Sequence, residues 1–418
     1  MLFANSRALR TKYQTLHSGC QMAGVYFLTG CTGFIGHELL RQLAAWKMDR
    51  TYCLIREREG RPAALRLHRA LSRAGIESDQ RFVAVAGDIE LANLGLTASC
   101  RAGLAREVTC VIHAAADVRF NQSVESIGST NVGGAKAVLG FVRDCVKENK
   151  SFSHLAYVST AFVAGCRLGV VDADALEHNA GFKNTYEESK YLAEQLVRQS
   201  MADFPVVVVR PSIVLGSADA ANVQPRDLLY PLVVSFASWP LPVIGQDPNV
   251  RVDFVPVDFV ARALLFLGER SENHGRTFHL AAGVGDDLSI AECTEVVARG
   301  LNRRVISVPT PIWNRFFLPS LARIAPSLAA DGGDGLEFFG PYLDQENPQF
   351  SMAATDLALG GSGIRRPKLT RVLESSVARA VADCKLAPAE SKGFAGARAV
   401  LRPLQHGAER VANAIRSS

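Results

Sequence analysis

The sequence of 418 residues lacks any apolar run long enough to cross a membrane. Its longest apolar stretch covers residues 230–245 and is interrupted by Pro231, Pro240 and Pro242. A spanning helix needs about 20 apolar residues in succession, so an integral membrane protein is not expected. Internal repeats and low-complexity blocks are also missing. The chain is 48% hydrophobic and 21% charged, which excludes a largely disordered protein and predicts one large or two modest domains.

The nine cysteines include no CxxC pair, and no histidine is spaced with cysteine or aspartate as zinc ligands commonly are. We therefore predict no metal site and no metal catalysis. A chain of this size does not need disulfide bonds to be stable. The thiols are accordingly expected to be reduced, and the protein to be cytoplasmic.

Positive charge is concentrated at the C-terminal end. Residues 361–418 contain eleven Lys or Arg and four Asp or Glu, whereas the whole chain has a net charge of +5. A basic segment suits an anionic lipid surface, a phosphate-bearing ligand or an acidic protein, but a solvated helix face explains it equally well. Together with the apolar and aromatic residues 312–328, it allows peripheral membrane contact. Nucleic acid is not expected as a partner.

Short β-branched runs alternate with helical stretches in the first half, a pattern typical of a parallel sheet covered by helices. The expected strands are 25–29, 52–56, 82–86, 108–113, 154–159, 205–209 and 277–280, and the expected helices are 34–46, 61–74, 131–148 and 187–201. This predicts an α/β fold with a doubly wound Rossmann-type sheet. The expected organisation is a flexible leader at 1–23, a nucleotide-binding domain at 24–285, an interleaved substrate-binding region at 215–385 and a basic tail at 386–418.

A glycine-rich turn lies between the first expected strand and the first expected helix. Gly30, Gly33 and Gly36 allow a tight turn, close approach of the backbone to a pyrophosphate, and close packing of helix on strand. The N–H groups and dipole of the following helix would face the phosphates. We predict a dinucleotide site here, with the cofactor contacted also by the other residues of the turn, Thr32, Phe34 and Ile35.

The end of the second strand distinguishes the two nicotinamide cofactors. Arg56 stands where a carboxylate would favour NADH, and its guanidinium can bind a 2′-phosphate, so NADPH is predicted. Glu57 is the alternative, because it could serve the ribose if Arg56 points elsewhere. Asp88 and Ile89 are expected to flank the adenine, although Asp88 could equally be a turn cap. The small residues Ala114 and Ala115 would let a flat cofactor lie against the backbone.

A tyrosine and a lysine four residues apart form the expected catalytic pair. Tyr186 and Lys190 share one helix face, and an ammonium beside a phenol should lower the phenol's pKa. Tyr186 would then donate a proton to a carbonyl oxygen that receives a hydride. Thr160, at the end of the fifth strand, could hydrogen-bond the same oxygen, with Ser159 as its rival and a strand-end cap as the plain alternative.

With these motifs, residues 24–285 resemble an extended short-chain dehydrogenase/reductase. The resemblance implies that Tyr186, Lys190 and Thr160 are catalytic and that Asn131 supports a proton-relay water. It also implies that the segment Pro211, Ser212 and Ile213 meets the nicotinamide. A narrower similarity, to the thioester reductase and fatty acyl-CoA reductase branch, rests on residues 53–56, 157–163, 252–258 and 350–355.

The narrower similarity implies an NADPH-dependent reductase whose substrate is an acyl thioester of CoA or of an acyl carrier protein. The product would be an aldehyde, or an alcohol after a second hydride. The apolar stretches 230–245 and 312–328 could line an acyl channel or be ordinary core. Two alternatives remain: a dehydrogenase, reductase or epimerase acting on a sterol, flavonoid or sugar nucleotide, and a non-catalytic NADP(H) sensor. The sequence does not predict an oligomeric state.

Overall fold

The structure is a computed structural model that describes residues 24–46, 48–58, 60–119, 122–217, 243–245, 247–312, 315, 342, 345–366 and 368–386. The chain divides into two compact units. The described residues within Met1–Ile213, Val255–Val284 and Pro348–Arg366 form the first, and those within Val214–Phe254, Gly285–Asn347 and Pro367–Ser418 the second. The predictions for the leader 1–23, for most of 230–245 and 312–328, and for the tail after Leu386 concern segments outside the described residues.

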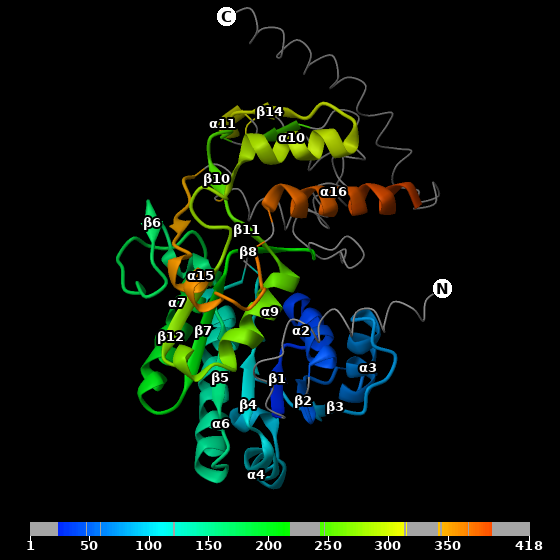
Figure 1. The fold of residues 1–418 in the computed structure, drawn as a ribbon, viewed down its shortest axis with the longest axis vertical. Helices are drawn as coiled ribbons and strands as arrows, with labels where there is room; N and C mark the ends of the chain where they lie inside the picture. Colours follow the sequence, from blue (N-terminus) through cyan, green and yellow to red (C-terminus); the bar gives the residue numbers. More distant parts are fainter. Residues whose placement is uncertain are drawn as a thin grey trace, which may run out of the picture. The chain divides into compact units, whose positions relative to one another are not determined.

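A seven-stranded parallel sheet forms the centre of the first unit (Figure 1). Its strands are β1 (Val25–Thr29), β2 (Arg50–Ile55), β3 (Phe82–Ala86), β4 (Cys110–His113), β5 (His154–Val158), β7 (Val206–Pro211) and β12 (Arg276–Leu280). The spatial order is β12-β7-β5-β4-β1-β2-β3. The chain thus winds outward from β1 in both directions, which confirms the predicted Rossmann-type fold. In such sheets ligands bind at the carboxyl edge, where the order reverses between β1 and β4.

Helices follow most of these strands. They are α2 (Phe34–Ala45), α3 (Ala63–Arg73), α4 (Ala98–Glu107), α5 (Val124–Gly128), α6 (Gly134–Glu148), α7 (Thr185–Gln199), α9 (Val257–Gly268) and α15 (Ala353–Ala358). Short helical turns are η1 (Ala92–Gly95), η2 (Ser129–Gly133), η3 (Ala161–Ala164), η4 (Ser200–Ala202) and η6 (Ser271–Asn273). The helix expected from Asn131 begins instead at Gly134, because η2 is a π-helical turn.

The two faces of the sheet carry different helices. On one face Phe27, Val111 and Leu155 pack in a buried core with residues of α4, α6 and α7. Successive side chains of a strand point to opposite faces. Tyr26 therefore points to the other face, where its hydroxyl donates to Glu269 directly after α9, and α2 packs against α9 there. The valines of β7, Val206–Val209, are fully buried, as expected of a strand covered on both faces.

Residues 348–366 attach to the first unit, although the sequence prediction placed them in the substrate region. Within them β15 (Gln349–Phe350) pairs in parallel with β6 (Val170–Val171). The Thr355 hydroxyl donates to the carbonyl oxygen of His279 in β12 at 2.6 Å. The Thr355 bond joins the segment to the edge strand β12 of the large sheet, while β15 and β6 form a small sheet of their own. Val214–Phe254, in contrast, belongs to the second unit.

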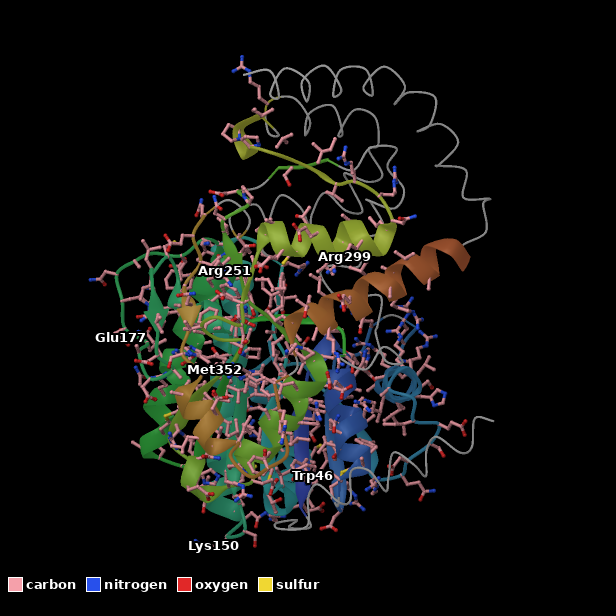
Figure 2. All side chains as sticks on the ribbon, turned by 45° about the horizontal axis from the view of Figure 1, so that its top comes forward. Trp46, Lys150, Glu177, Arg251, Arg299 and Met352 are labelled. Atoms are coloured by element: carbon pink, nitrogen blue, oxygen red, sulfur yellow. The ribbon has the colours of Figure 1, made fainter. Side chains whose placement is uncertain are left out.

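The described part of the second unit contains two small sheets and packed helices. Its elements are β9 (Val243–Gly245), β10 (Arg251–Val252), β13 (Leu288–Ser289), α10 (Ile290–Leu301), β14 (Ile306–Val308), α11 (Thr310–Ile312) and α16 (Leu369–Leu386). The strands β8 (Ile213–Leu215) and β11 (Phe254–Pro256) each have residues in both units, because the chain passes from one unit to the other within them. A capping box of Ser289 and Glu292 begins α10. Arg299 of α10, which is labelled in Figure 2, forms an ion pair with Glu374 of α16 at 3.6 Å. No helix among the described residues is long and apolar enough to span a membrane.

Candidate active site

The glycine turn packs directly against the end of β4. Gly30 has a φ of +80°, and a Cβ there would lie 2.6 Å from the carbonyl carbon of Ala114 and the nitrogen of Ala115. A Cβ on Gly36 would lie 2.0 Å from the carbonyl oxygen of Gly30. Side chains are therefore excluded at both positions, because the backbone after β4 and the turn itself lie against them.

The N-terminus of α2 is open to an anion. Its N-cap residue is Gly33, which supplies no side-chain hydrogen bond, and the first turn contains no acidic residue. Helix N-termini leave backbone N–H groups without helical partners and carry a partial positive charge. Thr32, Phe34 and Ile35 are partly exposed around this end. Among the described residues, the predicted pyrophosphate position thus offers backbone N–H donors and has no carboxylate in the first turn of the helix.

Arginines gather beyond the end of β2. Arg56 lies 3.2 Å from a carboxylate oxygen of Glu90 and 3.6 Å from one of Asp88. The pKa of Arg66 is lowered by burial and by its neighbours Arg58, Arg56 and Arg61. Within the described residues, Arg58, Arg61 and Arg66 form no ion pair, since the nearby carboxylates serve other groups. Sequence reasoning missed Arg58 and Arg66, although both lie within ten residues of Arg56.

Three residues predicted near the ribose and adenine have defined contacts. Glu57 accepts a hydrogen bond from the backbone N–H of Ala63, at the start of α3, at 3.2 Å. Its carboxylate is thus engaged as a helix cap, which weakens the alternative role at the ribose. Asp88 accepts from the backbone N–H of Glu90, as the turn-cap alternative predicted. The side chain of Ile89 belongs to the core, so only its backbone is available to a ligand.

Thr160 and Tyr186 meet at the carboxyl edge of the sheet. Tyr186 lies in the first turn of α7, and its hydroxyl shares a hydrogen bond with the Thr160 side chain. The Thr160 hydroxyl also lies 3.4 Å from the carbonyl oxygen of Pro211. Ser159 is turned away, because its hydroxyl donates to buried Glu194 at 2.5 Å. The geometry therefore favours Thr160 over its rival Ser159.

Lys190 is buried, and its ammonium faces β5. Its Nζ donates to the Tyr157 hydroxyl at 3.1 Å and to the carbonyl oxygen of Val158 at 2.8 Å. Burial lowers the pKa of Lys190 to about 8, against the opposing charge of Glu194. Burial also raises the pKa of Tyr186 to about 12, although the hydrogen bond from Thr160 opposes the rise. The prediction that the Tyr186 pKa is lowered was therefore wrong, because the removal of the hydroxyl from water has a larger effect on it than the neighbouring groups have.

Asn131 joins two segments of the site. Its side-chain amide donates to the carbonyl oxygen of Asp117 and to the Ser189 hydroxyl, both at 2.9 Å, and its oxygen accepts from the N–H of Asp117 at 2.8 Å. Ser189 in turn donates to the carbonyl oxygen of Tyr186 at 2.8 Å. Asn131 thus fixes the loop after β4 to the first turn of α7, and its role toward a relay water stays a prediction.

Ser212 carries a buried hydroxyl that bonds to no described residue. It is 5% exposed, and its Oγ has no hydrogen-bond partner within the described part of the chain. It follows Pro211 at the end of β7, beside Thr160, and precedes Ile213, which is partly buried. An unpaired buried hydroxyl lowers stability, so its presence at the predicted nicotinamide segment fits a polar ligand group.

Next to the carboxyl edge of the sheet, Glu194, Arg198 and Arg210 form a network of ion pairs. Glu194 of α7 accepts three hydrogen bonds from Arg210 of β7, at 2.7–3.0 Å, and one from Arg198 at 2.9 Å. Glu194 and Arg210 are both 0% exposed. Sequence reasoning missed this network. The only signal was that Glu194 lies one helical turn after Lys190, while Arg210 precedes the proline of the nicotinamide segment.

The fold and these contacts define a nucleotide-binding protein of the short-chain dehydrogenase/reductase type. Residues 28–264, more than half of the chain, match the NAD-binding family described as male sterility protein. The chain therefore belongs to this family, which confirms the predicted thioester reductase and fatty acyl-CoA reductase branch.

Relatives with known names support this placement. The chain is 27% identical to the fatty acyl-CoA reductase wat of Drosophila melanogaster, over 57% of this chain and 53% of that protein. It is 30% identical to the nonribosomal peptide synthetase asaC of Aspergillus flavus, over 62% of this chain and 26% of that protein. The chain thus spans about a quarter to a half of the length of these curated relatives.

A solved structure matches over nearly the whole chain. It is the terminal R domain from the myxalamid PKS-NRPS biosynthetic pathway, with a TM-score of 0.74 and 26% identity. The match covers 88% of this chain and 93% of that domain. A reductase domain of a nonribosomal peptide synthetase from Mycobacterium tuberculosis shares the fold, with a TM-score of 0.68 and 21% identity.

Proposed function

We propose that the protein is an NADPH-dependent reductase of acyl thioesters. The observation that carries this proposal is the pair of hydroxyls of Thr160 and Tyr186, which are hydrogen-bonded to each other beside the Pro211 segment. Two converging O–H groups suit a carbonyl oxygen that gains negative charge. The substrate class is taken from the relatives, which include a fatty acyl-CoA reductase and a terminal reductase domain.

The residues at the carboxyl edge fit a dinucleotide. The open N-terminus of α2 would hold the pyrophosphate, and the Ser212 hydroxyl would bond the nicotinamide carboxamide. Arg66 and Arg58, with Arg56, would hold a 2′-phosphate, because guanidinium groups bind phosphate in a bidentate manner. The reason to propose NADPH over NADH is that Arg58, Arg61 and Arg66 gather here without an ion-pair partner among the described residues, although Arg66 donates a hydrogen bond to the carbonyl oxygen of Arg56.

NADPH bound there supplies the hydride to the thioester carbonyl. Tyr186 holds its proton at neutral pH, since its pKa is near 12, and gives it to the carbonyl oxygen as negative charge develops. Thr160 donates a second hydrogen bond to the same oxygen. The ammonium of Lys190, one helical turn from Tyr186 and protonated below about pH 8, would stabilise the phenolate that remains by its charge, since its hydrogen bonds go to Tyr157 and Val158.

Addition of hydride and proton gives a hemithioacetal. Its collapse releases an aldehyde and a free thiol, which would be CoA or the phosphopantetheine of a carrier protein. A second round at the same hydroxyls would give the alcohol. We propose thioesters of CoA and of a carrier protein alike as substrates, since both present the same thioester group.

Product analysis tests the proposal directly. Purified protein is incubated with NADPH and either long-chain acyl-CoA or an acyl carrier protein, and aldehyde, alcohol and free thiol are measured. We expect one thiol per NADPH oxidised when the aldehyde is the product, and one per two when it is the alcohol. Oxidation of a hydroxysteroid with NAD⁺, and no thiol release from either thioester, would instead favour the sterol-type alternative.

A further inference from the structure

A second group of chemically active side chains lies at the opposite, amino-terminal edge of the sheet. Tyr26, Cys110 and His154 are direct neighbours across β1, β4 and β5, because the strand register pairs Tyr26 with Cys110 and Cys110 with His154. All three point to the face covered by α9. The fourth member, Glu269, follows the last residue of α9 and accepts a hydrogen bond from the Tyr26 hydroxyl.

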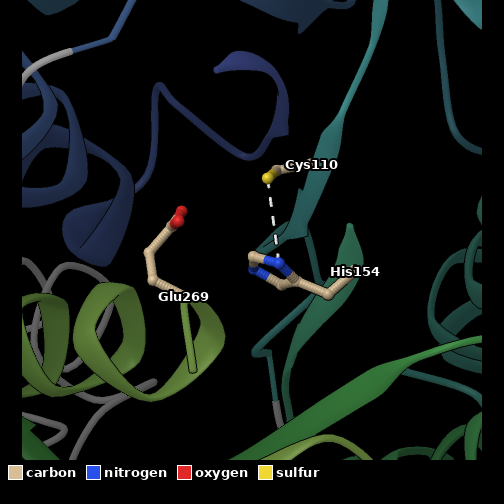
Figure 3. A group of neighbouring side chains, drawn as sticks. All are labelled: Cys110, His154 and Glu269. Atoms are coloured by element: carbon tan, nitrogen blue, oxygen red, sulfur yellow. Dashed lines mark hydrogen bonds between the residues drawn. The ribbon is translucent and has the colours of Figure 1, made fainter. Parts of the chain in front are cut away.

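Three of these residues direct Lewis-basic atoms toward one space (Figure 3). One ligand atom each of Cys110, His154 and Glu269 lies within 4.8 Å of the other two. The Sγ of Cys110 is 3.7 Å from Nδ1 of His154. Cys110 and His154 are 3% and 2% exposed, so water does not compete freely for these atoms.

The ring of His154 is held so that Nδ1 is the nitrogen that faces the group. A Cβ at Gly268 would lie 2.6 Å from Nε2, which shows how closely α9 packs on that side of the ring. On the other side, Nδ1 is 3.1 Å from the Ser153 hydroxyl and 3.7 Å from the Cys110 thiol, both of which can donate a hydrogen bond to it. Nδ1 is thus the ring nitrogen beside the Cys110 thiol, placed to offer a lone pair to a metal ion shared with Cys110.

We propose that Cys110, His154 and Glu269 bind a zinc ion that joins the starts of β4 and β5 to the end of α9. A thiolate, an imidazole and a carboxylate are the ligands that zinc prefers in proteins. Tyr26 holds the carboxylate as outer-shell partners of metal ligands usually do. With bond lengths of about 2.0–2.3 Å, the donors need to approach one another by roughly 1 Å, and water completes the four-coordinate site.

Zinc replaces the thiol proton of Cys110, so binding forms an S–Zn bond and releases that proton to solvent. The resulting charge balances, because one thiolate and one carboxylate neutralise the divalent ion. The site could not be predicted from the sequence, since its ligands are far apart along the chain: the parallel register brings Cys110 to His154, and the end of α9 brings Glu269 to both. The proposed role is structural and does not depend on the reductase proposal.

Metal content of the full-length protein tests the inference. The protein is produced with zinc in the medium, purified without chelator, and analysed by mass spectrometry for zinc per chain. We expect close to one zinc per chain in the wild type, and at least a hundredfold weaker zinc binding in Cys110→Ser and Glu269→Gln. The matched control is Cys145→Ser, which alters a buried cysteine of the core around α6 and should keep the metal.

Cobalt provides a second readout that reports the ligand itself. Co²⁺ added to metal-free wild-type protein should give a thiolate-to-cobalt charge-transfer band in the near ultraviolet, lost in Cys110→Ser and kept in Cys145→Ser. Zinc should also raise the unfolding temperature of the wild type. Wild-type protein without zinc and without the cobalt band, or zinc that persists in Cys110→Ser, would overturn the site and leave an ordinary buried hydrogen-bonded group.

Discussion

The ammonium of Lys190 and the hydroxyl of Tyr157 form a buried hydrogen bond of 3.1 Å. Lys190 also lies over the Tyr157 ring, 4.6 Å from its centroid. Tyr157 comes from β5, and beside it His113 of β4 bonds the Thr29 hydroxyl of β1 at 2.7 Å. The end of each of these strands thus contributes one polar group beneath the candidate active site.

Tyr157 positions the lysine, so Tyr157→Phe should impair turnover without abolishing it. Loss of one hydrogen bond to a charged group corresponds to about 1.5 kcal/mol, or roughly a tenfold fall in kcat. The KM for the thioester should change little, because Tyr157 is buried below the site. Steady-state kinetics measures both. Tyr52→Phe, which alters a surface tyrosine bonded to Glu107, is the control and should behave as wild type.

Arg66 should determine the preference for NADPH. Arg66→Ala removes a guanidinium with no ion-pair partner among the described residues, so the 2′-phosphate would lose a charge-assisted hydrogen bond. We expect the Kd for NADPH to rise about 10- to 100-fold and the Kd for NADH to stay constant, as measured by fluorescence titration. Equal weakening of both cofactors would contradict a phosphate contact.

Ser212→Ala should have opposite effects on the free and the cofactor-bound protein. Removing an unpaired buried hydroxyl should raise the free energy of unfolding by about 1 kcal/mol without cofactor. The same change should weaken NADPH binding about tenfold, because the proposed bond to the carboxamide is lost. Ser200→Ala is the control. The buried Ser200 hydroxyl donates to the carbonyl oxygen of Leu196, so the variant should be less stable but should still bind the cofactor. Lower stability in Ser212→Ala would show that the hydroxyl has a partner.

Burial of His279 makes stability depend on pH. Burial and the charge of Arg210 lower its pKa to about 3, from an ordinary value near 6.5. Between these values the unfolded chain binds a proton that the folded chain does not, so stability is full above pH 6.5 and falls as the pH drops. His279→Gln should reduce this slope by about 1.4 kcal/mol per pH unit. Urea unfolding at pH 5, 6 and 7 measures it, and an unchanged slope would show that His279 does not titrate in this way.

The sheet, its parallel order and the glycine turn could be predicted because they depend on local patterns. The expected ranges of β1 and β3 agree with the structure, since each is a short apolar run followed directly by a glycine, Gly30 or Gly87. The start of α6 could not be predicted, because a π turn at Asn131 has no distinct residue pattern. The ion pair between Arg210 and Glu194 was also missed, since Arg210 lies in strand β7 and Glu194 in helix α7, and only the tertiary fold brings them together.

The electrostatics of the site were the least predictable part. Tyr186 and Lys190 do lie in one helix, as their spacing predicted, but the direction of the Tyr186 pKa was not predicted. That direction depends on how far the hydroxyl is removed from water, which sequence spacing does not report. The buried neighbours of Lys190 likewise come from β5 and not from its own helix.

Proton donation by Tyr186 is tested by the turnover and the cofactor binding of Tyr186→Phe, both measured with NADPH and an acyl thioester. Tyr191→Phe, which alters the tyrosine bonded to Glu177, is the matched control and should retain wild-type activity. We expect Tyr186→Phe to lower kcat about a thousandfold, because the proton donor is lost, while the Kd for NADPH stays within about threefold. Turnover within tenfold of the wild type would contradict proton donation by Tyr186 and, with it, the proposed reductase mechanism.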